Sequence, residues 1–309
     1  MRTPPSQFPG PAAIACGMRI AITGASGLIG GQLLASLHRD GHEVRQLVRR
    51  VPRNGSEVQW DPQAGGIDAA ALRGVDAVVH LAGAGVGDRR WTSQYKQRIL
   101  ESRTRGTDAI ARAVVAAEVP VLISASAIGF YGDTADRAVD ETSGPGSGFL
   151  ADVVVAWEAA TQPAVDAGVR VAYARTGLVA AGQGGAFGRM LPLFRMGLGG
   201  PLGDGRQYWS PITLRDEVRA LRFLLKQPLT GPFNLTAPTP VTNREFTAAL
   251  GRALHRPTLL PVPRFALSLV VGEFAGEILG SQRVLPTRLL GAGFNFADAT
   301  LQEITASLL

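Results

Sequence analysis

The sequence predicts an α/β fold, in which a parallel sheet with helices on both faces is joined to a smaller C-terminal α/β lobe. Two observations carry this prediction. Short apolar runs alternate with segments of helical apolar spacing between residues 18 and 175, as in a doubly wound sheet. The runs are almost continuously apolar, which is typical of strands that are covered on both faces. A chain of 309 residues with 46% hydrophobic content is also long enough to bury a full core.

The elements of this first part follow one another regularly. Apolar runs predict strands, and apolar residues at helical spacing, such as Leu33, Leu34 and Leu37, predict helices. The expected strands are 18–23, 43–48, 76–81, 119–124 and 169–174, and the expected helices are 28–39, 91–117 and 151–167. Right-handed crossovers between parallel strands then place helices on both faces of the sheet.

The pattern changes beyond Arg175. The stretch 177–206 is rich in glycine and indicates a long loop over a site. A short strand is expected at 233–235, and residues 257–263 are punctuated by proline. Helices are expected at 214–226 and 243–254, and two or three further helical segments are expected from 264 to 309.

Charge and cysteine content exclude several classes of protein. The formal net charge is +6, but the arginines are scattered and not interleaved with aromatic residues, so we expect no nucleic-acid partner. The basic balance instead suits an anionic cofactor or substrate, or simply an arginine-rich proteome. Cys16 is the only cysteine, so no intramolecular disulfide and no cysteine-based metal site can form, which favours the cytoplasm.

The N-terminal segment 1–17 is rich in proline, glycine and alanine and lacks the apolar region of a signal peptide. Because the first apolar run starts at once after Met18, we expect a disordered leader and a physiological start at Met18. No apolar run is long enough to span a bilayer, and the longest candidate is interrupted by Glu273 and Glu277. We therefore expect no membrane partner.

The segment T-G-A-S-G-L-I-G joins the first predicted strand to the first predicted helix. Gly24 permits a sharp turn, Gly27 lets the backbone approach a pyrophosphate, and Gly30 lets the helix pack close to the sheet. The free N–H groups of the helix N-terminus then face the phosphates. The sequence thus predicts a Rossmann-type dinucleotide site whose contacts are Gly24, Ala25, Ser26, Gly27, Leu28, Ile29 and Gly30.

The residues after the second predicted strand indicate which dinucleotide binds. Sites selective for NAD place an acidic residue there to bind the ribose hydroxyls. This sequence has Arg49 and Arg50 instead, and Asp40 and Glu43 lie at the wrong end of the strand. A guanidinium group matches the oxygens of a 2′-phosphate. We therefore expect NADP(H), with Arg49 as the main phosphate contact and Arg50 assisting, although both could also be solvated surface arginines.

Several further segments resemble a known family. The glycine-rich turn, H-L-A-G at 80–83, S-A-S-A-I-G-F-Y-G at 124–132 and G-D-G-R-Q at 203–207 followed by Asp216 resemble the extended short-chain dehydrogenase/reductase superfamily. The chain further resembles its epimerase-like subfamily with a C-terminal domain of unknown function. The subfamily marks are R-W-T at 90–92, E-S-R at 101–103, Phe149-Leu150, Trp157-Glu158, S-Q-R-V at 281–284, Pro286 and Gly293-Phe294.

This resemblance implies a domain division and some functional labels. It implies an NADP(H)-binding Rossmann domain at 18–175, to which later segments contribute, and a substrate lobe at 176–309 with a small helical domain at about 255–309. Members are often called nucleoside-diphosphate-sugar epimerases, and some are called cell-division inhibitors. Related folds often dimerise through the long helices that flank the sheet, so a homodimer is one expected assembly.

The sequence departs from the superfamily at its catalytic pair. The superfamily uses Tyr-x-x-x-Lys, in which the lysine lowers the tyrosine pKa so that the phenolate moves a proton while nicotinamide moves a hydride. The expected positions hold Phe149 and Val153. Tyr131 lies nearby but has no lysine at the right spacing. The candidate catalytic residues are therefore Ser124, Ser126 and Tyr131, and the two serines could equally well pack beside the cofactor.

The resemblance also implies further cofactor contacts. Arg103 stands where relatives commonly have asparagine, and it could reach the nicotinamide or a substrate anion. Thr213 replaces a histidine of close relatives, His80 is expected to be structural, and Glu158 could face the site or cap a helix. The remaining expected contacts lie at strand ends: Leu81, Ala82 and Gly83 after the third strand, and Arg175, Gly177 and Leu178 after the fifth.

Three functions compete at this point. The first is an NADP(H)-binding oxidoreductase or epimerase-like enzyme that acts on a small anionic substrate. The second is a non-catalytic NADP(H)-binding regulator or redox sensor, which the missing Tyr-x-x-x-Lys pair favours. The third is a cell-division factor that acts through protein contacts, for which no sequence feature argues independently.

Overall fold

A seven-stranded parallel sheet forms the centre of the molecule. The structure, a computed structural model, describes residues 17–62 and 66–309. The predicted leader, Cys16 included, therefore lies almost wholly outside the described residues. The strand order is β10-β6-β5-β4-β1-β2-β3, and every neighbouring pair is parallel. The strands are β1 (Arg19–Thr23), β2 (Glu43–Val48), β3 (Glu57–Gln59), β4 (Ala77–His80), β5 (Val121–Ala127), β6 (Arg170–Thr176) and β10 (Gly231–Leu235).

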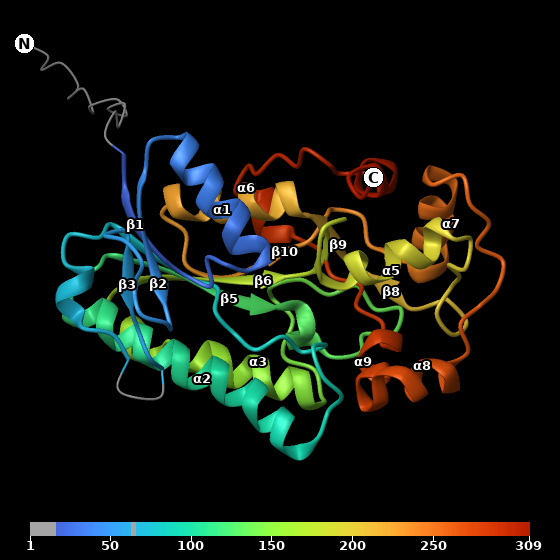
Figure 1. The fold of residues 1–309 in the computed structure, drawn as a ribbon, viewed down its shortest axis with the longest axis horizontal. Helices are drawn as coiled ribbons and strands as arrows, with labels where there is room; N and C mark the ends of the chain where they lie inside the picture. Colours follow the sequence, from blue (N-terminus) through green and yellow to red (C-terminus); the bar gives the residue numbers. More distant parts are fainter. Residues whose placement is uncertain (1–16, 63–65) are drawn as a thin grey trace, which may run out of the picture.

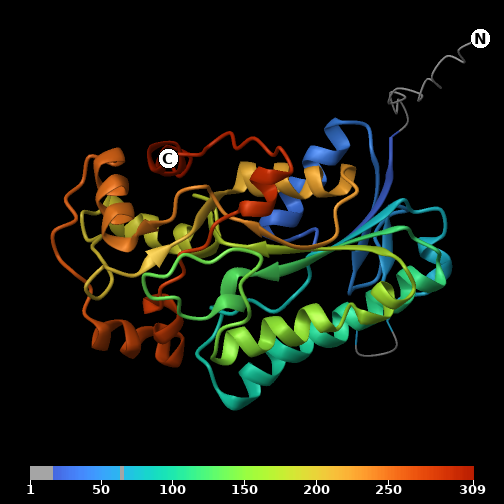
Figure 2. The ribbon, with the colours of Figure 1, turned by 180° about the vertical axis from the view of Figure 1, so that it is seen from behind.

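Helices cover both faces of this sheet, as Figures 1 and 2 show, so the predicted doubly wound fold is confirmed. On one face lie α1 (Leu28–Arg39) and α6 (Leu214–Lys226), and on the other lie α2 (Ser93–Ala116) and α3 (Phe149–Ala159). Two cores fill the layers. The α1 and α6 side buries Leu33, Leu37 and Leu221, and the α2 side buries Ile110 and Val114.

The predicted helix at 151–167 is in fact two helices. The first, α3, ends at Ala159, and α4 (Gln162–Asp166) begins after Thr161. Pro163 explains the break, because proline has no N–H to continue the hydrogen-bond ladder and is tolerated only in the first turn of a helix.

The glycine-rich stretch 177–206 is not one long loop as expected. It contains β7 (Leu178–Ala180), which pairs with β9 (Pro211–Thr213), and α5 (Gly185–Arg195). Phe187, Leu191 and Phe194 of α5 are buried in a third core. Their spacing is helical, but the surrounding glycines hid the pattern.

The helices of the segment from 255 to 309 pack against different parts of the molecule. The first helices, α8 (Arg264–Val271) and α9 (Ala275–Leu279), lie at the edge of the molecule, joined by the 3-10 turn η3 (Gly272–Phe274) (Figure 1). Leu289 of α10 (Thr287–Gly291) belongs to the α1 and α6 core. The last helix, α11 (Leu301–Ala306), packs on α7 (Asn243–Ala253), and β8 (Tyr208–Trp209) pairs with β11 (Val241–Thr242) beside them. The remaining 3-10 turns are η1 (Ala69–Leu72) and η2 (Ile128–Tyr131).

Candidate functional site

The turn between β1 and α1 can be built only with glycine at two positions. Gly24 has a φ of +70°, and a Cβ on it would lie 2.9 Å from the carbonyl carbon of Leu81. A Cβ on Gly30 would lie 2.2 Å from the carbonyl oxygen of Gly24. The backbone can therefore turn sharply off the strand, and the helix can start directly against it, only because both side chains are absent. Ala25 packs into the core of this face, and Ser26 is exposed.

The N-terminus of α1 has no side-chain partner, although the N–H of Gly27 donates within the turn to the carbonyl oxygen of Gly24 at 2.9 Å. Its N-cap is Gly27, which offers no side-chain cap, and its first turn contains no acidic residue. The first N–H groups of a helix have no intrahelical acceptor, and they carry the positive end of the helix dipole. Gly27, Leu28, Ile29 and Gly30 therefore form a site that suits an anionic group such as a pyrophosphate.

Arg49 and Arg50 follow β2 but differ in their surroundings. Arg50 makes two hydrogen bonds with Glu57 on β3, of 2.7 Å and 2.6 Å, so its guanidinium group is already engaged. Arg49 is exposed and has no hydrogen bond or ion pair with any residue in 17–62 or 66–309. Of the two, only Arg49 is free to bind a phosphate.

The carboxyl end of β4 is fixed by a buried hydroxyl group. The Thr23 oxygen accepts the N–H groups of Leu81, at 3.0 Å, and Ala82, at 3.1 Å, and lies 2.8 Å from Nδ1 of His80. Since both N–H groups donate to this oxygen, its own proton goes to His80. Burial lowers the pKa of His80 to about 4, so the imidazole is neutral. His80 therefore orients the Thr23 hydroxyl, which holds Leu81 and Ala82 in place, while the buried Nε2 of His80 has no partner among the described atoms.

Arg103 is a half-buried cation that pairs with no carboxylate among residues 17–62 and 66–309. Its Nη1 donates to the carbonyl oxygens of Ala84, at 2.9 Å, and Ile99, at 3.2 Å, and its guanidinium carbon lies 4.9 Å from the ring of Trp157. A Cβ on Gly83 would lie 3.5 Å from that carbon. Burial lowers the pKa of Arg103 to about 10, so it stays charged at neutral pH. Its remaining donors can serve an anion at the end of β4.

A closed polar network occupies the ends of β5 and β6. Arg175 donates from Nε and Nη2 to the two oxygens of Glu158, at 2.8 Å each, and from Nη1 to the Tyr131 hydroxyl, at 3.0 Å. Ser126 donates to Glu158 at 2.5 Å, and Tyr131 donates to Asn234 at 2.9 Å. The guanidinium group of Arg175 also stacks on Phe130 at 3.5 Å. Glu158 therefore joins two predicted site residues, Ser126 and Arg175, and Arg175 joins a third, Tyr131.

The predicted catalytic hydroxyl groups are all buried. Tyr131 is 1% exposed, and burial raises its pKa. Ser124 is fully buried and donates to the carbonyl oxygen of Ala125, at 3.2 Å. Ser126 is committed to Glu158. In this arrangement the three hydroxyl groups hold the strand ends and Arg175, and none faces an open cleft.

The backbone after Arg175 is likewise used within the protein. The N–H of Gly177 donates to Leu235 at 2.9 Å, and that of Leu178 donates to Ser210 at 3.0 Å. A Cβ on Gly177 would lie 2.4 Å from the Ser210 oxygen, so only glycine fits. Gly177 and Leu178 can therefore contact a cofactor only through other atoms.

An apolar cluster fills the place of the expected Tyr-x-x-x-Lys pair. The ring of Phe149 meets Trp91 edge-on at 5.0 Å, and Val153 is buried in the same cluster, to which Phe274 of η3 is added. The Nζ of Lys96 lies 4.9 Å from the centre of the Phe149 ring, but Lys96 already forms an ion pair with Glu273. This region has an aromatic wall and no hydroxyl group of a tyrosine at the position where the superfamily has one.

Glu217 is a buried acid beside the end of β6 that the sequence did not reveal. It is 1% exposed, and its Oε1 accepts a hydrogen bond of 2.7 Å from Thr176 at the end of β6. Its other oxygen has no hydrogen-bond partner among the described atoms. Burial raises the pKa of Glu217 to about 8. An acidic residue in the first turn of a helix usually interacts with the helix dipole at the surface. The sequence therefore contained no sign that Glu217 is buried.

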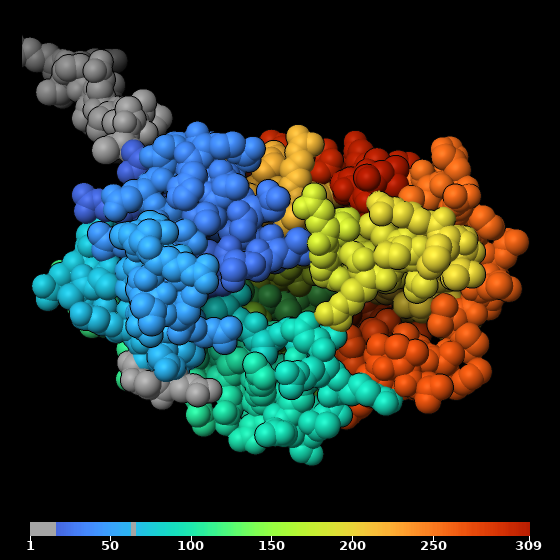
Figure 3. All heavy atoms as spheres, viewed as in Figure 1, coloured from blue at the N-terminus to red at the C-terminus, as the bar shows by residue number. Residues whose placement is uncertain are grey.

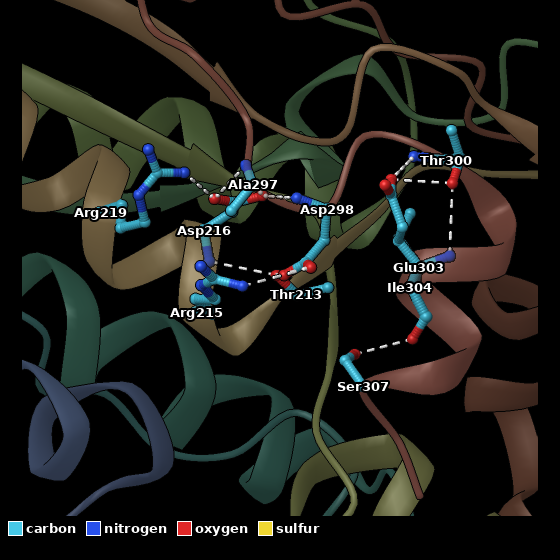
Figure 4. A network of polar contacts seen from close by, with 10 residues as sticks. All are labelled: Thr213, Arg215, Asp216, Arg219, Ala297, Asp298, Thr300, Glu303, Ile304 and Ser307. Carbon is cyan, nitrogen blue, oxygen red and sulfur yellow. Dashed lines mark hydrogen bonds and ion pairs between the residues drawn. The ribbon is translucent and has the colours of Figure 1, made fainter.

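The neighbouring Asp216 has a structural role (Figure 4). Its carboxylate accepts the N–H groups of Ala297, at 2.9 Å, and Asp298, at 2.8 Å, and also binds Arg219. Asp298 in turn accepts from Thr213 at 2.8 Å and lies 3.7 Å from Arg215. A cavity of about 450 Å³ adjoins this network, but its charged lining residues are already engaged: Arg215 pairs with Asp298, and Glu303 accepts hydrogen bonds from Thr300 in the cap of α11.

The candidate site as a whole lies along the carboxyl ends of the strands, where open α/β sheets bind ligands. Figure 3 shows a hollow between the N-terminal segment, in blue, and the α5 segment, in yellow. Residues coloured green, which lie between these two segments in the sequence, are recessed at its floor. Among residues 17–62 and 66–309, no group of His, Cys, Asp and Glu side chains could hold a metal ion. In the same residues, no helix is both long and apolar enough to cross a membrane.

Comparison with known proteins identifies the family. Residues 20–235 match the family model described as the NAD dependent epimerase/dehydratase family. The chain belongs to this family. Residues 262–308 match a second model, a domain of unknown function called DUF1731. The resemblance that the motifs indicated is thereby confirmed.

Relatives from distant organisms match the chain along most of its length. "Epimerase family protein Mb2239" of Mycobacterium bovis is 51% identical over 286 residues, which cover 92% of this chain and 95% of the relative. The chloroplastic "Epimerase family protein SDR39U1 homolog" of Arabidopsis thaliana is 38% identical, covering 94% and 87%. The crystal structure of human SDR39U1 with NADPH has a TM-score of 0.86 and 31% identity, covering 94% of this chain and 99% of that chain.

Proposed function

We propose that this protein binds NADP(H), with the pyrophosphate at the N-terminus of α1 and the 2′-phosphate on Arg49. The observation that carries the proposal is Arg49 itself, an exposed and unpaired arginine at the end of β2. The glycine positions support the fit, since a side chain at Gly24 or Gly30 would fill the space at the turn. The human relative solved with NADPH also supports the phosphorylated cofactor.

We further propose an oxidoreductase or epimerase-like activity on a small anionic substrate. When bound, NADP(H) supplies a hydride donor or acceptor. Arg103 would hold the substrate anion or the nicotinamide end, because it keeps its charge and has spare donors. Arg175 and Glu158 would keep the strand ends in place. With Phe149 in the tyrosine position, the proton must come from another group than the superfamily phenolate.

A second candidate is a non-catalytic NADP(H)-binding regulator or redox sensor. The observation that favours it is the apolar packing of Phe149 and Val153 where the family chemistry needs an acid and a cation. No feature of residues 17–62 and 66–309 points to cell division. The homodimer and the cytoplasmic location stay predictions.

The cofactor assignment is tested by substituting the two adjacent arginines. Arg49→Ala removes the phosphate contact, and charge-assisted hydrogen bonds of this kind contribute enough for a loss of about 10- to 100-fold in NADPH affinity. The Kd for NADH should change little. Isothermal titration of both cofactors measures the two values.

Arg50→Ala is the matched control, since it removes the same charge one residue away from a guanidinium group that Glu57 already engages. We expect its NADPH affinity to stay close to that of the wild type. Equal losses for NADPH and NADH in Arg49→Ala would contradict the 2′-phosphate assignment.

A turnover assay with NADPH distinguishes the two candidate functions. An enzyme should oxidise NADPH above the solvent background with at least one member of a panel of small carbonyl acids, and Arg103→Ala should remove that rate. A regulator should bind NADPH with the same affinity but show no oxidation with any member of the panel.

A further inference from the structure

Large apolar side chains gather at one edge of the molecule. Of the thirteen that are exposed among the described residues, eight lie in 193–198 and 259–270. The most exposed of them, Leu259, is 84% exposed, and Phe265 and Leu269 of α8 are 76% and 75% exposed. We call this surface the apolar edge; it consists of Leu193, Met196, Leu198, Leu259, Leu260, Phe265, Leu269 and Val270.

The two segments form one continuous surface. Arg256 donates from Nε to the carbonyl oxygen of Arg195 at 2.8 Å, and the N–H of Val262 donates to Pro201 at 2.8 Å. The N–H of Gly203 returns a hydrogen bond of 2.9 Å to Val262. In Figure 3 the α5 segment, in yellow, and the segment from about 250 to 275, in orange, meet at the right-hand edge.

The side chains of the apolar edge do not pack into the core of the protein. Helix α8 has no buried residue, although six of its eight residues are apolar. It is anchored through Arg90, which reaches the carbonyl oxygen of Ser268 at 3.5 Å, and through the 3-10 turn η3 that follows it. A monomeric protein rarely exposes so large a contiguous apolar surface without a binding role.

The charges within the two segments all have one sign, although Asp204 and Glu273 lie directly beyond their ends. No Asp or Glu occurs between Glu245 and Glu273, and none occurs from 189 to 203. The exposed arginines of these two segments have no ion pair with any described carboxylate, apart from Arg189, which pairs with Asp88. The unpaired ones are Arg195, Arg252, Arg256 and Arg264. A second copy of this chain would set these arginines against one another, so the charges favour an anionic partner.

We propose that the apolar edge binds the surface of an anionic lipid membrane. Phe265, Leu269 and Leu259 would enter the boundary between head groups and acyl chains, and the flanking arginines would contact lipid phosphates, as in interfacial helices. Helix α8 lies at the rim of the molecule (Figure 1), where a fluid, flat surface can cover it without a matching groove. Such binding needs no membrane-spanning helix, and it departs from the expectation of no membrane partner.

The test is flotation of the full chain with phosphatidylcholine vesicles that contain either no or 30% phosphatidylglycerol (about one lipid in three, an ordinary anionic content). We expect binding to the anionic vesicles only, and its loss in about 0.5 M salt, where the Debye length is much shortened. Phe265→Glu should lower the partition coefficient about tenfold or more.

Val51→Glu is the matched control, because Val51 is 73% exposed and lies outside the apolar edge. It adds the same negative charge and should bind as the wild type does. Equal weakening by Val51→Glu, or no binding to anionic vesicles, would overturn the proposal. A dimer that Phe265→Glu abolishes, without vesicle binding, would assign the apolar edge to contact between copies instead.

Discussion

The two ends of the candidate nucleotide site satisfy their polar groups in opposite ways. At the phosphate end, the N-terminus of α1 has no side-chain cap and Arg49 has no partner in the described part of the chain. At the other end, Arg175 engages Glu158 and Tyr131, and Ser126 completes the set. One end presents unpaired donors, and the other is closed upon itself.

This difference separates the residues that we propose bind the cofactor from those that hold the fold. N–H and guanidinium donors without a protein acceptor form hydrogen bonds only when an anion binds. Their positions therefore indicate where an anionic ligand would bind. A buried pair such as Arg175 and Glu158 is already satisfied, and removing one partner leaves an uncompensated charge. Substitutions at the closed end should therefore affect stability most, and those at the open end should affect cofactor binding.

The largest effect is expected from Glu158→Ala at the closed end. It leaves the buried guanidinium group of Arg175 without its carboxylate, so the free energy of unfolding should fall by about 3–5 kcal/mol. Urea denaturation measures the change. Glu101→Ala, which removes the half-buried partner of the exposed Arg105 at the surface of α2, is the control and should have little effect. Comparable losses in both variants would show that the closed network does not stabilise the fold.

Glu217→Gln tests the buried acid beside the closed end, one oxygen of which has no partner among the described atoms. In the folded protein burial raises the pKa of Glu217 to about 8, whereas its ordinary value is 4.5. Between these values the unfolded chain has released a proton that the folded chain still holds. Ionisation therefore favours the unfolded state, and wild-type stability falls as the pH rises from about 4.5 to about 8.

Glutamine does not titrate, so the variant should gain stability over the wild type across that pH range. The gain from pH 5 to pH 8 should be on the order of 2–4 kcal/mol, measured by thermal denaturation at several pH values. Parallel stability curves for the two proteins would mean that Glu217 ionises normally in the folded state.

Gly30→Ala should have the smallest effect on stability but a direct effect at the open end. Its Cβ would lie 2.2 Å from the Gly24 oxygen, and relieving such crowding costs about 1–3 kcal/mol and shifts the turn that we propose receives the pyrophosphate. NADPH affinity should fall with it, as a fluorescence titration would measure.

The next residue in the same helix provides the control. A Cβ on Gly31 would meet the Ala25 oxygen at an ordinary 3.6 Å, so Gly31→Ala should raise stability by about 0.5–1 kcal/mol through helix propensity. Unchanged NADPH binding in Gly30→Ala would remove the turn from the proposed site.

Local patterns predicted the frame of the site because its determinants lie close together in the chain. The bounds of α1 and β2 agree with those expected from apolar spacing. The need for glycine at 24 and 30 arises within seven residues, and the family motifs lie at the ends of predicted strands. The sequence also showed, without the structure, that Phe149 and Val153 replace the catalytic pair.

Only the tertiary structure decided which polar residues are free. The sequence treats Arg49 and Arg50 alike, but pairing of β2 with β3, which the sequence did not predict, brings Glu57 to Arg50 alone. Tyr131 finds its acceptor Asn234 103 positions away, and Glu217 meets Thr176 41 positions before it. Periodicity and turn chemistry are local, whereas burial and hydrogen-bond partners arise from packing between distant segments.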